Sequence, residues 1–257
     1  MVSGTGRTRG RFTSVVVERA AALFANVRND PGDDTARLVL ADWLEEHDES
    51  DLGQFLRAGV VASRFRDEPV IEDRAYFDAI VALAGVASWG TPARWLSELG
   101  IGPSPLTSTD WLWDNTGDRV TVRIGRVSGV FTRGLLSELV APLGEWYEFA
   151  PVVFAGWPLE GGTVTDVPGL RFHVEAPTVE RPEWRLSAVL TVQPRRRRAG
   201  AMGILASLGP LPSLRWEAER TFPDRATLAD RIPRASVVLV DDLIDAAGAL
   251  WPSPPNV

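Results

Sequence analysis

The first hundred residues carry apolar side chains at intervals of three and four positions, the spacing that gathers side chains on one face of an α-helix. In the first such segment the apolar positions are Val16, Ala20, Leu23, Phe24 and Val27. The segment ends in the turn-forming residues 29–32, after which Asp33 or Asp34 is placed to cap the next helix. The same spacing predicts helices over residues 14–29, 35–47, 52–65, 72–87 and 93–99.

From residue 119 onward the pattern changes to strand-like runs, most of which alternate apolar with polar residues. We predict strands over residues 119–124, 126–132, 151–155, 170–174, 184–192 and 214–219. Helices are predicted over residues 135–143, 199–208 and 225–231, and residues 236–240 form either a strand or the start of a last helix that ends near Leu250. These elements predict an α+β fold, in which an N-terminal helical module precedes a mixed domain with an antiparallel-rich sheet.

Glycine and proline mark the predicted boundary between the two parts, in the run from Gly100 to Pro105. We therefore divide the chain into a helical module over residues 13–99, a linker over residues 100–117 and an α+β domain over residues 118–251. The Gly/Arg-rich residues 1–12 are predicted to be a disordered tail, and the proline-rich residues 252–257 a frayed end.

The composition excludes several classes of function. The net charge of −7 lacks the basic balance of a nucleic-acid-binding protein, and no apolar stretch is long enough to span a membrane. Cysteine and lysine are both absent, which excludes thiolate catalysis, Schiff-base chemistry and a P-loop lysine. With only two histidines, we predict no metal and no cofactor, and the absence of cysteine favours a cytoplasmic location.

The run Asp33-Asp34-Thr35-Ala36-Arg37-Leu38-Val39-Leu40-Ala41-Asp42-Trp43-Leu44-Glu45-Glu46-His47 has a recognisable form, and Phe55-Leu56-Arg57 follows it. Over residues 21–57 the chain resembles the repeat-companion domain of planctomycete-type bacterial proteins. The resemblance implies a helical fold for this segment and makes the module over residues 13–99 repeat-companion-like. It implies no established activity and no catalytic residues.

The densest cluster of candidate binding residues lies within this run, and it has two interpretations. As a recognition surface, an indole and several carboxylates would meet a basic partner. As a structural element, the indole would anchor the core, the arginine would bridge to Asp33 or Asp34, and the glutamates would form a solvated face. The residues are Arg37, Asp42, Trp43, Glu45 and Glu46.

Two further groups are weaker candidates. Trp111 and Trp113 alternate beside a turn, so they form either an exposed aromatic platform or a packing contact between the domains. The basic run Arg195, Arg196, Arg197 and Arg198 would either grip phosphate groups or lie in a solvated loop.

Neither histidine has the neighbours of a metal site or a catalytic pair. His47 is placed to interact with the C-terminal end of a helix, and His173 is expected to be a half-exposed strand residue. We therefore predict a non-catalytic protein-interaction or scaffolding protein that binds another protein, with no oligomeric state predicted. The alternatives are a carboxylate-dependent enzyme and a nucleic-acid-associated protein that uses residues 195–198.

Overall fold

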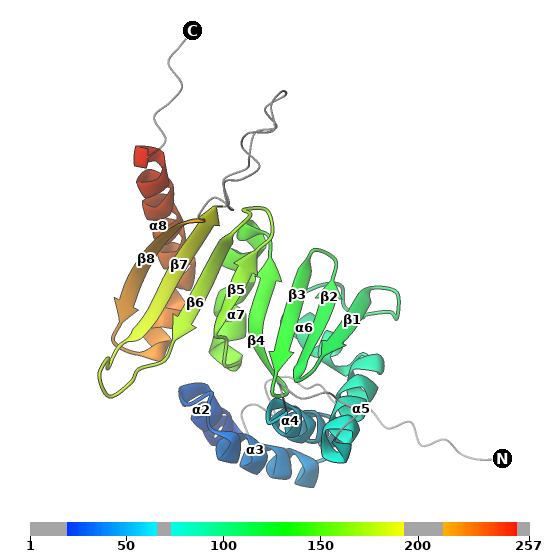
Figure 1. The fold of residues 1–257 in the computed structure, drawn as a ribbon. Helices are drawn as coiled ribbons and strands as arrows, with labels where there is room; N and C mark the ends of the chain where they lie inside the picture. Colours follow the sequence, from blue (N-terminus) through cyan, green and yellow to red (C-terminus); the bar gives the residue numbers. More distant parts are fainter. Residues whose placement is uncertain (1–19, 66–72, 193–212, 251–257) are drawn as a thin grey trace, which may run out of the picture. The chain divides into compact units, whose positions relative to one another are not determined.

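The computed structural model describes residues 20–65, 73–192 and 213–250 (Figure 1). Residues 248–250 are described by their backbone only. The chain divides into two compact units. Unit 1 comprises Met1–Gly125, Phe131–Leu135 and Gly156–Pro158, and unit 2 comprises Arg126–Val130, Leu136–Ala155 and Leu159–Val257. The predicted α+β class is confirmed, with the helical region first and a mostly antiparallel sheet after it.

Unit 1 begins with helices in the places that the apolar spacing predicts. Residues 14–19 and residue 72, where two predicted helices begin, lie outside the described residues. The helices are α2 (Ala21–Asn29), α3 (Asp34–Glu46), α4 (Ser50–Ser63), α5 (Arg74–Ser88) and α6 (Thr91–Glu98).

Two of these helices begin at aspartate caps, because a carboxylate satisfies the first backbone N–H groups that have no partner within the helix. An Asp33 carboxylate oxygen accepts from the backbone N–H of Thr35 at 2.8 Å. Asp73 accepts in the same way from the N–H groups of Ala75 at 2.7 Å and Tyr76 at 3.1 Å. The predicted cap of the second helix is therefore confirmed, and the capping residue is Asp33.

An aromatic cluster forms the centre of unit 1. The ring of Phe55 on α4 lies 5.6 Å from that of Trp95 on α6 and 6.0 Å from that of Phe131, and Trp95 lies 6.0 Å from Trp157. Phe55 and Phe131 meet edge to face, an arrangement that aromatic pairs prefer. This cluster joins segments that are distant in the sequence into one core.

Helix α4 packs closely against the turn at Arg133 and Gly134. A side chain at Gly59 would place its Cβ 2.4 Å from the backbone nitrogen of Gly134. Gly134 has a φ of +77°, and its own Cβ would lie 2.5 Å from the Cα of Leu56. Glycine is required on both sides because the two backbones touch.

The segment predicted as a linker, residues 100–117, contains strand β1 (Trp111–Thr116). This strand pairs antiparallel with β2 (Arg119–Ile124), the strand predicted over residues 119–124. Both strands belong to unit 1, which extends to Gly125 and so does not end at residue 99.

The eight strands follow one another in the order β1 to β8 in the sheet. Strands β4 and β5, which helix α7 connects in the sequence, pair in parallel. Strands β5 to β8 pair antiparallel, which confirms the prediction of an antiparallel-rich sheet. The remaining elements are β3 (Val127–Thr132), β4 (Leu135–Ala141), α7 (Leu143–Gly156), β5 (Gly161–Val164), β6 (Leu170–Glu175), β7 (Trp184–Val192), β8 (Leu214–Phe222) and α8 (Arg225–Leu250).

Two predictions of element type are wrong. The helix predicted over residues 135–143 is strand β4. Side chains on both faces of this strand are buried, so apolar residues do not alternate with polar ones along it. The strand predicted over residues 151–155 lies inside helix α7, which contains Pro151 in its interior. Proline disfavours a helix interior, and this made the run resemble a strand.

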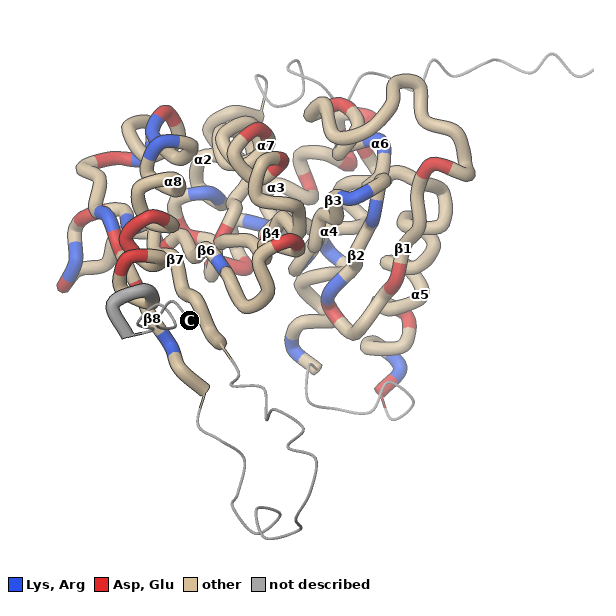
Figure 2. Tube along the Cα trace, turned by 90° about the horizontal axis from the view of Figure 1, so that it is seen from above, with Lys and Arg blue, Asp and Glu red and all other residues tan. Residues whose placement is uncertain are grey.

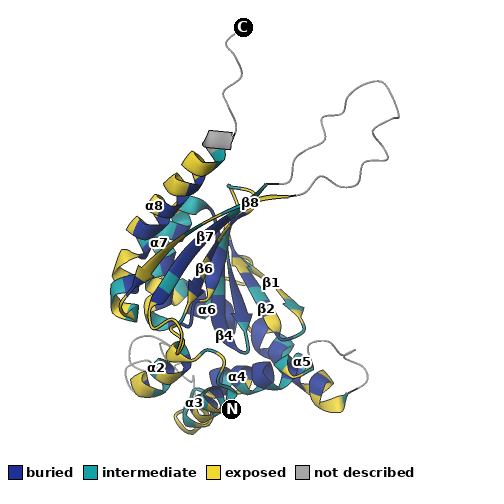
Figure 3. Ribbon diagram, turned by 60° about the vertical axis from the view of Figure 1, so that its left-hand side comes forward, coloured by how far each residue is buried: buried dark blue, intermediate teal, exposed yellow. Residues whose placement is uncertain are grey.

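Helices α7 and α8 lie on the same face of the unit 2 strands (Figures 1 and 3). Residues 236–240 belong to α8, so the helical alternative was the right one, and α8 is continuous from Arg225 to Leu250. Trp146 of α7 stacks on Phe172 of β6 with ring centroids 4.8 Å apart, and its indole N–H donates to Ser236 Oγ at 3.2 Å. Gly162 makes room for this indole, because a Cβ there would lie 2.3 Å from the ring.

Candidate functional site

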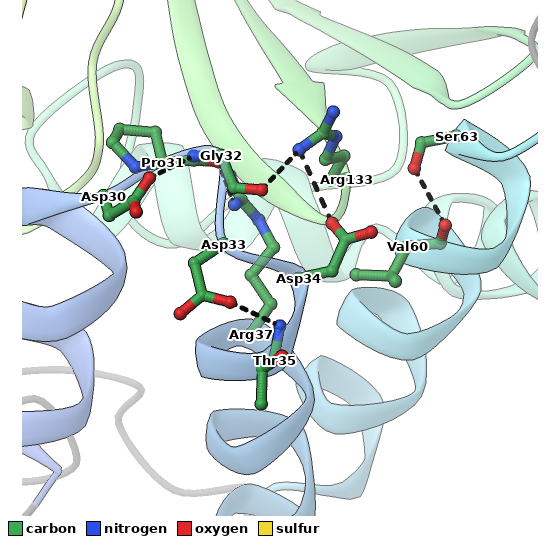
Figure 4. Close-up of polar contacts among 10 residues, drawn as sticks. All are labelled: Asp30, Pro31, Gly32, Asp33, Asp34, Thr35, Arg37, Val60, Ser63 and Arg133. Atoms are coloured by element: carbon green, nitrogen blue, oxygen red, sulfur yellow. Dashed lines mark hydrogen bonds and ion pairs between the residues drawn. The ribbon is translucent and has the colours of Figure 1, made fainter.

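The turn between α2 and α3 binds two arginines of unit 1 (Figure 4). Arg37 is 2% exposed, and its guanidinium donates to the carbonyl of Pro31. Arg133 donates to the carbonyl of Gly32 at 3.3 Å and pairs with Asp34 at 3.5 Å. Arg133 therefore pairs with Asp34, the first residue of α3 after its cap Asp33, and Arg37 is a buried residue of α3 whose side chain reaches the turn.

Two carboxylates of α3, those of Asp42 and Glu45, are paired with an arginine from α4. Arg57 contacts Asp42 at 2.5 Å and Glu45 at 3.3 Å. The hydrogen bonds to Asp42 and Glu45 raise the pKa of the Arg57 guanidinium above its ordinary value. Gly53 allows this approach of the two helices, because a Cβ there would lie 2.6 Å from the Glu45 side chain. Asp42 and Glu45 thus form an exposed ion-pair network with Arg57, an arrangement that contributes little to the stability of the fold.

Trp43 lies at the end of α3 and is half-buried. Its ring stacks on that of His47 with centroids 4.0 Å apart and planes 14° apart, and His47 Nδ1 lies 2.7 Å from the Trp43 carbonyl oxygen. His47 is the C-terminal cap residue of the helix, as predicted. Trp43 is therefore a packing residue at the edge of unit 1 and not a fully buried anchor, and the neighbouring Glu46 is exposed.

Trp111 and Trp113 point to the same face of β1, the face that β2 extends with Val122 and Ile124. The ring of Trp111 lies against Gly90, where a Cβ would come within 2.7 Å of it. Trp113 is 37% exposed. Within unit 1 the two indoles thus lie between core and surface. The other group of candidates, residues 195–198, lies outside the described residues, as does the predicted helix over residues 199–208.

Among the described residues of unit 1, helix α5 carries an exposed apolar row that the sequence analysis did not identify. On α5, Phe77 is 47% exposed, Val81 is 53% exposed and Trp89, the C-cap residue, is 58% exposed. Gly85 completes a row with a spacing of four residues, and nothing lies within 4 Å of a Cβ built on it. We call Phe77, Val81, Gly85 and Trp89 the α5 stripe.

The α5 stripe contains no charged residue, and the charges of the helix lie at its N-terminal end (Figure 2). There Arg74 pairs with Asp78 at 2.9 Å and lies 5.9 Å from the centre of the Phe77 ring. The opposite face of the helix is buried, and it carries Tyr76, Ala79, Leu83 and Val86. Helix α5 is therefore apolar on two faces, of which one has no cover within the described residues.

This property was visible in the sequence. Residues 79–87 contain no charged or strongly polar side chain, although one apolar face is enough to attach a helix to a domain. The signal was missed because the predicted helix over residues 72–87 was assigned no faces. His173, by contrast, lies as expected on the exposed face of β6, between buried Phe172 and Val174.

Among the residues described, none of the helices has both the length and the apolar character needed to span a bilayer. In the same part of the chain, no group of three or more His, Asp or Glu side chains is placed to hold a metal ion. No family model, curated protein or solved structure matches the chain.

Proposed function

We propose that this chain is a non-catalytic protein-interaction or scaffolding protein, and that unit 1 binds its partner through the α5 stripe. The observation that carries the proposal is the exposure of Phe77, Val81 and Trp89 in one row of a helix whose other face is already buried. Contiguous apolar surfaces of this kind mark binding sites on monomeric proteins, and aromatic residues contribute most of the energy at such sites.

The candidate binding residues on α3 support a binding surface less well than the α5 stripe does. Asp42 and Glu45 are engaged by Arg57, and Arg37 is buried. A basic partner would have to displace Arg57 to reach these carboxylates, at the cost of existing ion pairs. For the same reason the carboxylate-dependent enzyme is the weaker alternative, since a pair of acidic groups does catalysis only in a cleft with different surroundings for each.

We also propose that residues 21–57 are a repeat-companion-type module. The two segments that carry the resemblance, residues 33–47 and 55–57, contact one another in space. Arg57 of the shorter segment binds Asp42 and Glu45 of the longer one. A cytoplasmic location accompanies this proposal, since the chain has no cysteine to form disulfides in an oxidising compartment.

Affinity capture from the native host, with bound proteins identified by mass spectrometry, tests the function. The stripe variant is Phe77→Ser/Val81→Ser. The matched control is Val237→Ser/Val238→Ser on α8, where the two valines are 42% and 43% exposed.

The wild-type chain and the control should retain the same partner, and the stripe variant should lose it. Each variant replaces two exposed apolar side chains with serine, so a loss confined to the stripe variant assigns the binding to the α5 stripe. If the stripe variant retains the same proteins as the wild type, the α5 stripe is not the binding surface and the proposal is wrong.

A further inference from the structure

We infer that the partner of the α5 stripe is a second copy of this chain, and that two α5 helices pack antiparallel about a two-fold axis. The inference rests on the proposed function, since it names the occupant of the same surface. In a two-fold contact, residue i of one copy meets residue j of the other, and the reverse contact occurs as well. A self-complementary surface is therefore the requirement, and the α5 stripe meets it.

The spacing of the stripe provides the first part of the complementarity. Its members are four residues apart, which is the ridge that helices use when they interlock at a crossing angle of about −50°. With the axis on the stripe midway between Val81 and Gly85, Phe77 of one copy faces Trp89 of the other. The pairing places a large ring against a large ring at both ends of the contact, where exposed aromatic area is greatest.

The centre of the stripe provides the second part. The same two-fold axis places Val81 of one copy opposite Gly85 of the other. The space above Gly85 is open, because no atom lies within 4 Å of a Cβ built there. Val81 projects from the surface and Gly85 leaves a depression, so each copy offers one knob and one hole. Small residues at a crossing allow two helix backbones to approach to about 8 Å.

Charge provides the third part. Arg74 lies in the first turn of α5, where it opposes the positive end of its own helix dipole. In the antiparallel pair Arg74 also lies beside the C-terminal end of the other copy's α5 and beside that copy's Trp89 ring. Both the negative end of a helix dipole and an aromatic ring attract a cation. Two chains that each carry a charge of −7 repel one another, so an uncharged contact surface is the one that self-association favours.

Sedimentation velocity of the full chain from about 1 to about 100 μM tests the inference. The wild type should form a dimer. Val81→Glu buries an unpaired charge and Gly85→Arg fills the hole, so each alone should weaken the dimer on the order of 100-fold. An equimolar mixture of the two should restore dimers, because the introduced glutamate then faces the introduced arginine. Val152→Glu on α7, at a valine 46% exposed, is the control that should dimerise like the wild type.

Far-UV circular dichroism and thermal unfolding establish that each variant folds. A wild type that stays monomeric over the whole range overturns the inference, whether or not the variants fold. So does a dimer that persists in Val81→Glu, or a mixture that stays monomeric. A monomeric wild type whose stripe variant still loses a captured protein would leave the proposed function intact with a different partner, so the two failures are distinguishable.

Discussion

Two glycines in neighbouring helices of unit 1 should respond to the same substitution with opposite signs. A methyl group on Gly85 of α5 meets nothing within 4 Å, whereas a methyl group on Gly59 of α4 lies 2.4 Å from the nitrogen of Gly134 and 2.5 Å from the carbonyl carbon of Arg133. Both positions are inside helices, so alanine improves the intrinsic helix propensity of each by about 1 kcal/mol.

At Gly85 nothing offsets this gain, and Gly85→Ala should raise the free energy of unfolding by about 0.5–1 kcal/mol. At Gly59 the added carbon meets backbone atoms, which cannot rotate away as a side chain would. Overpacking of this kind costs about 1–3 kcal/mol or more, so Gly59→Ala should be destabilising in spite of the better propensity.

Urea denaturation followed by circular dichroism measures both changes, at a protein concentration at which the chain sediments as a monomer. The midpoint should rise for Gly85→Ala and fall for Gly59→Ala at unchanged slope. Equal shifts of the two midpoints would refute the reasoning, because propensity alone would then explain both. A loss of stability in Gly85→Ala would show that the space above α5 is filled within the monomer.

Four other substitutions test individual contacts. The Asn115 side-chain amide is buried without a hydrogen-bond partner among the described residues, so Asn115→Leu should stabilise the fold by about 1 kcal/mol in urea denaturation; a loss would show that a partner exists. Burial, and to a smaller extent nearby acidic groups, raise the pKa of Glu49. The ionised carboxylate therefore destabilises the fold at neutral pH, and this penalty is lost as the pH falls through the raised pKa. Glu49→Gln should therefore be more stable than the wild type at pH 7, and thermal melts should lose this difference in acid. Trp43→Ala should cost about 1–2 kcal/mol at its half-buried site, and Trp146→Ala about 3–5 kcal/mol in the core; equal losses would contradict this assignment of core and edge.

The sequence allowed prediction of elements that bury one face and expose the other. Helix α3 and strand β6 follow their expected periods closely, and Asp33 caps its helix as expected. Strand β7 has the predicted bounds, although side chains on both of its faces are buried in its middle. Strand β4 was mistaken for a helix because Leu135, Leu136 and Leu139 are all buried, which leaves no alternation to read.

The candidate site was harder to predict for a different reason. Local spacing placed Asp42 and Glu45 on one helix face, but the arginine that pairs with them comes from another helix, and Arg133 reaches Asp34 from a position 99 residues away. Contacts at such separations follow from tertiary packing, which periodicity does not encode. The α5 stripe was in principle readable, because an apolar helix with two apolar faces needs two neighbours.

Contact across the α5 stripe can be measured directly by disulfide trapping, because the chain has no cysteine of its own. Chains carrying Val81→Cys and Gly85→Cys are mixed under mild oxidation, and covalent dimers are separated on a non-reducing gel. Antiparallel packing predicts rapid cross-linking in the mixture, slower cross-linking for either variant alone, and the slowest for a Val152→Cys control in unit 2. Cross-linking of the mixture no faster than that of the control would contradict a contact between copies at the α5 stripe.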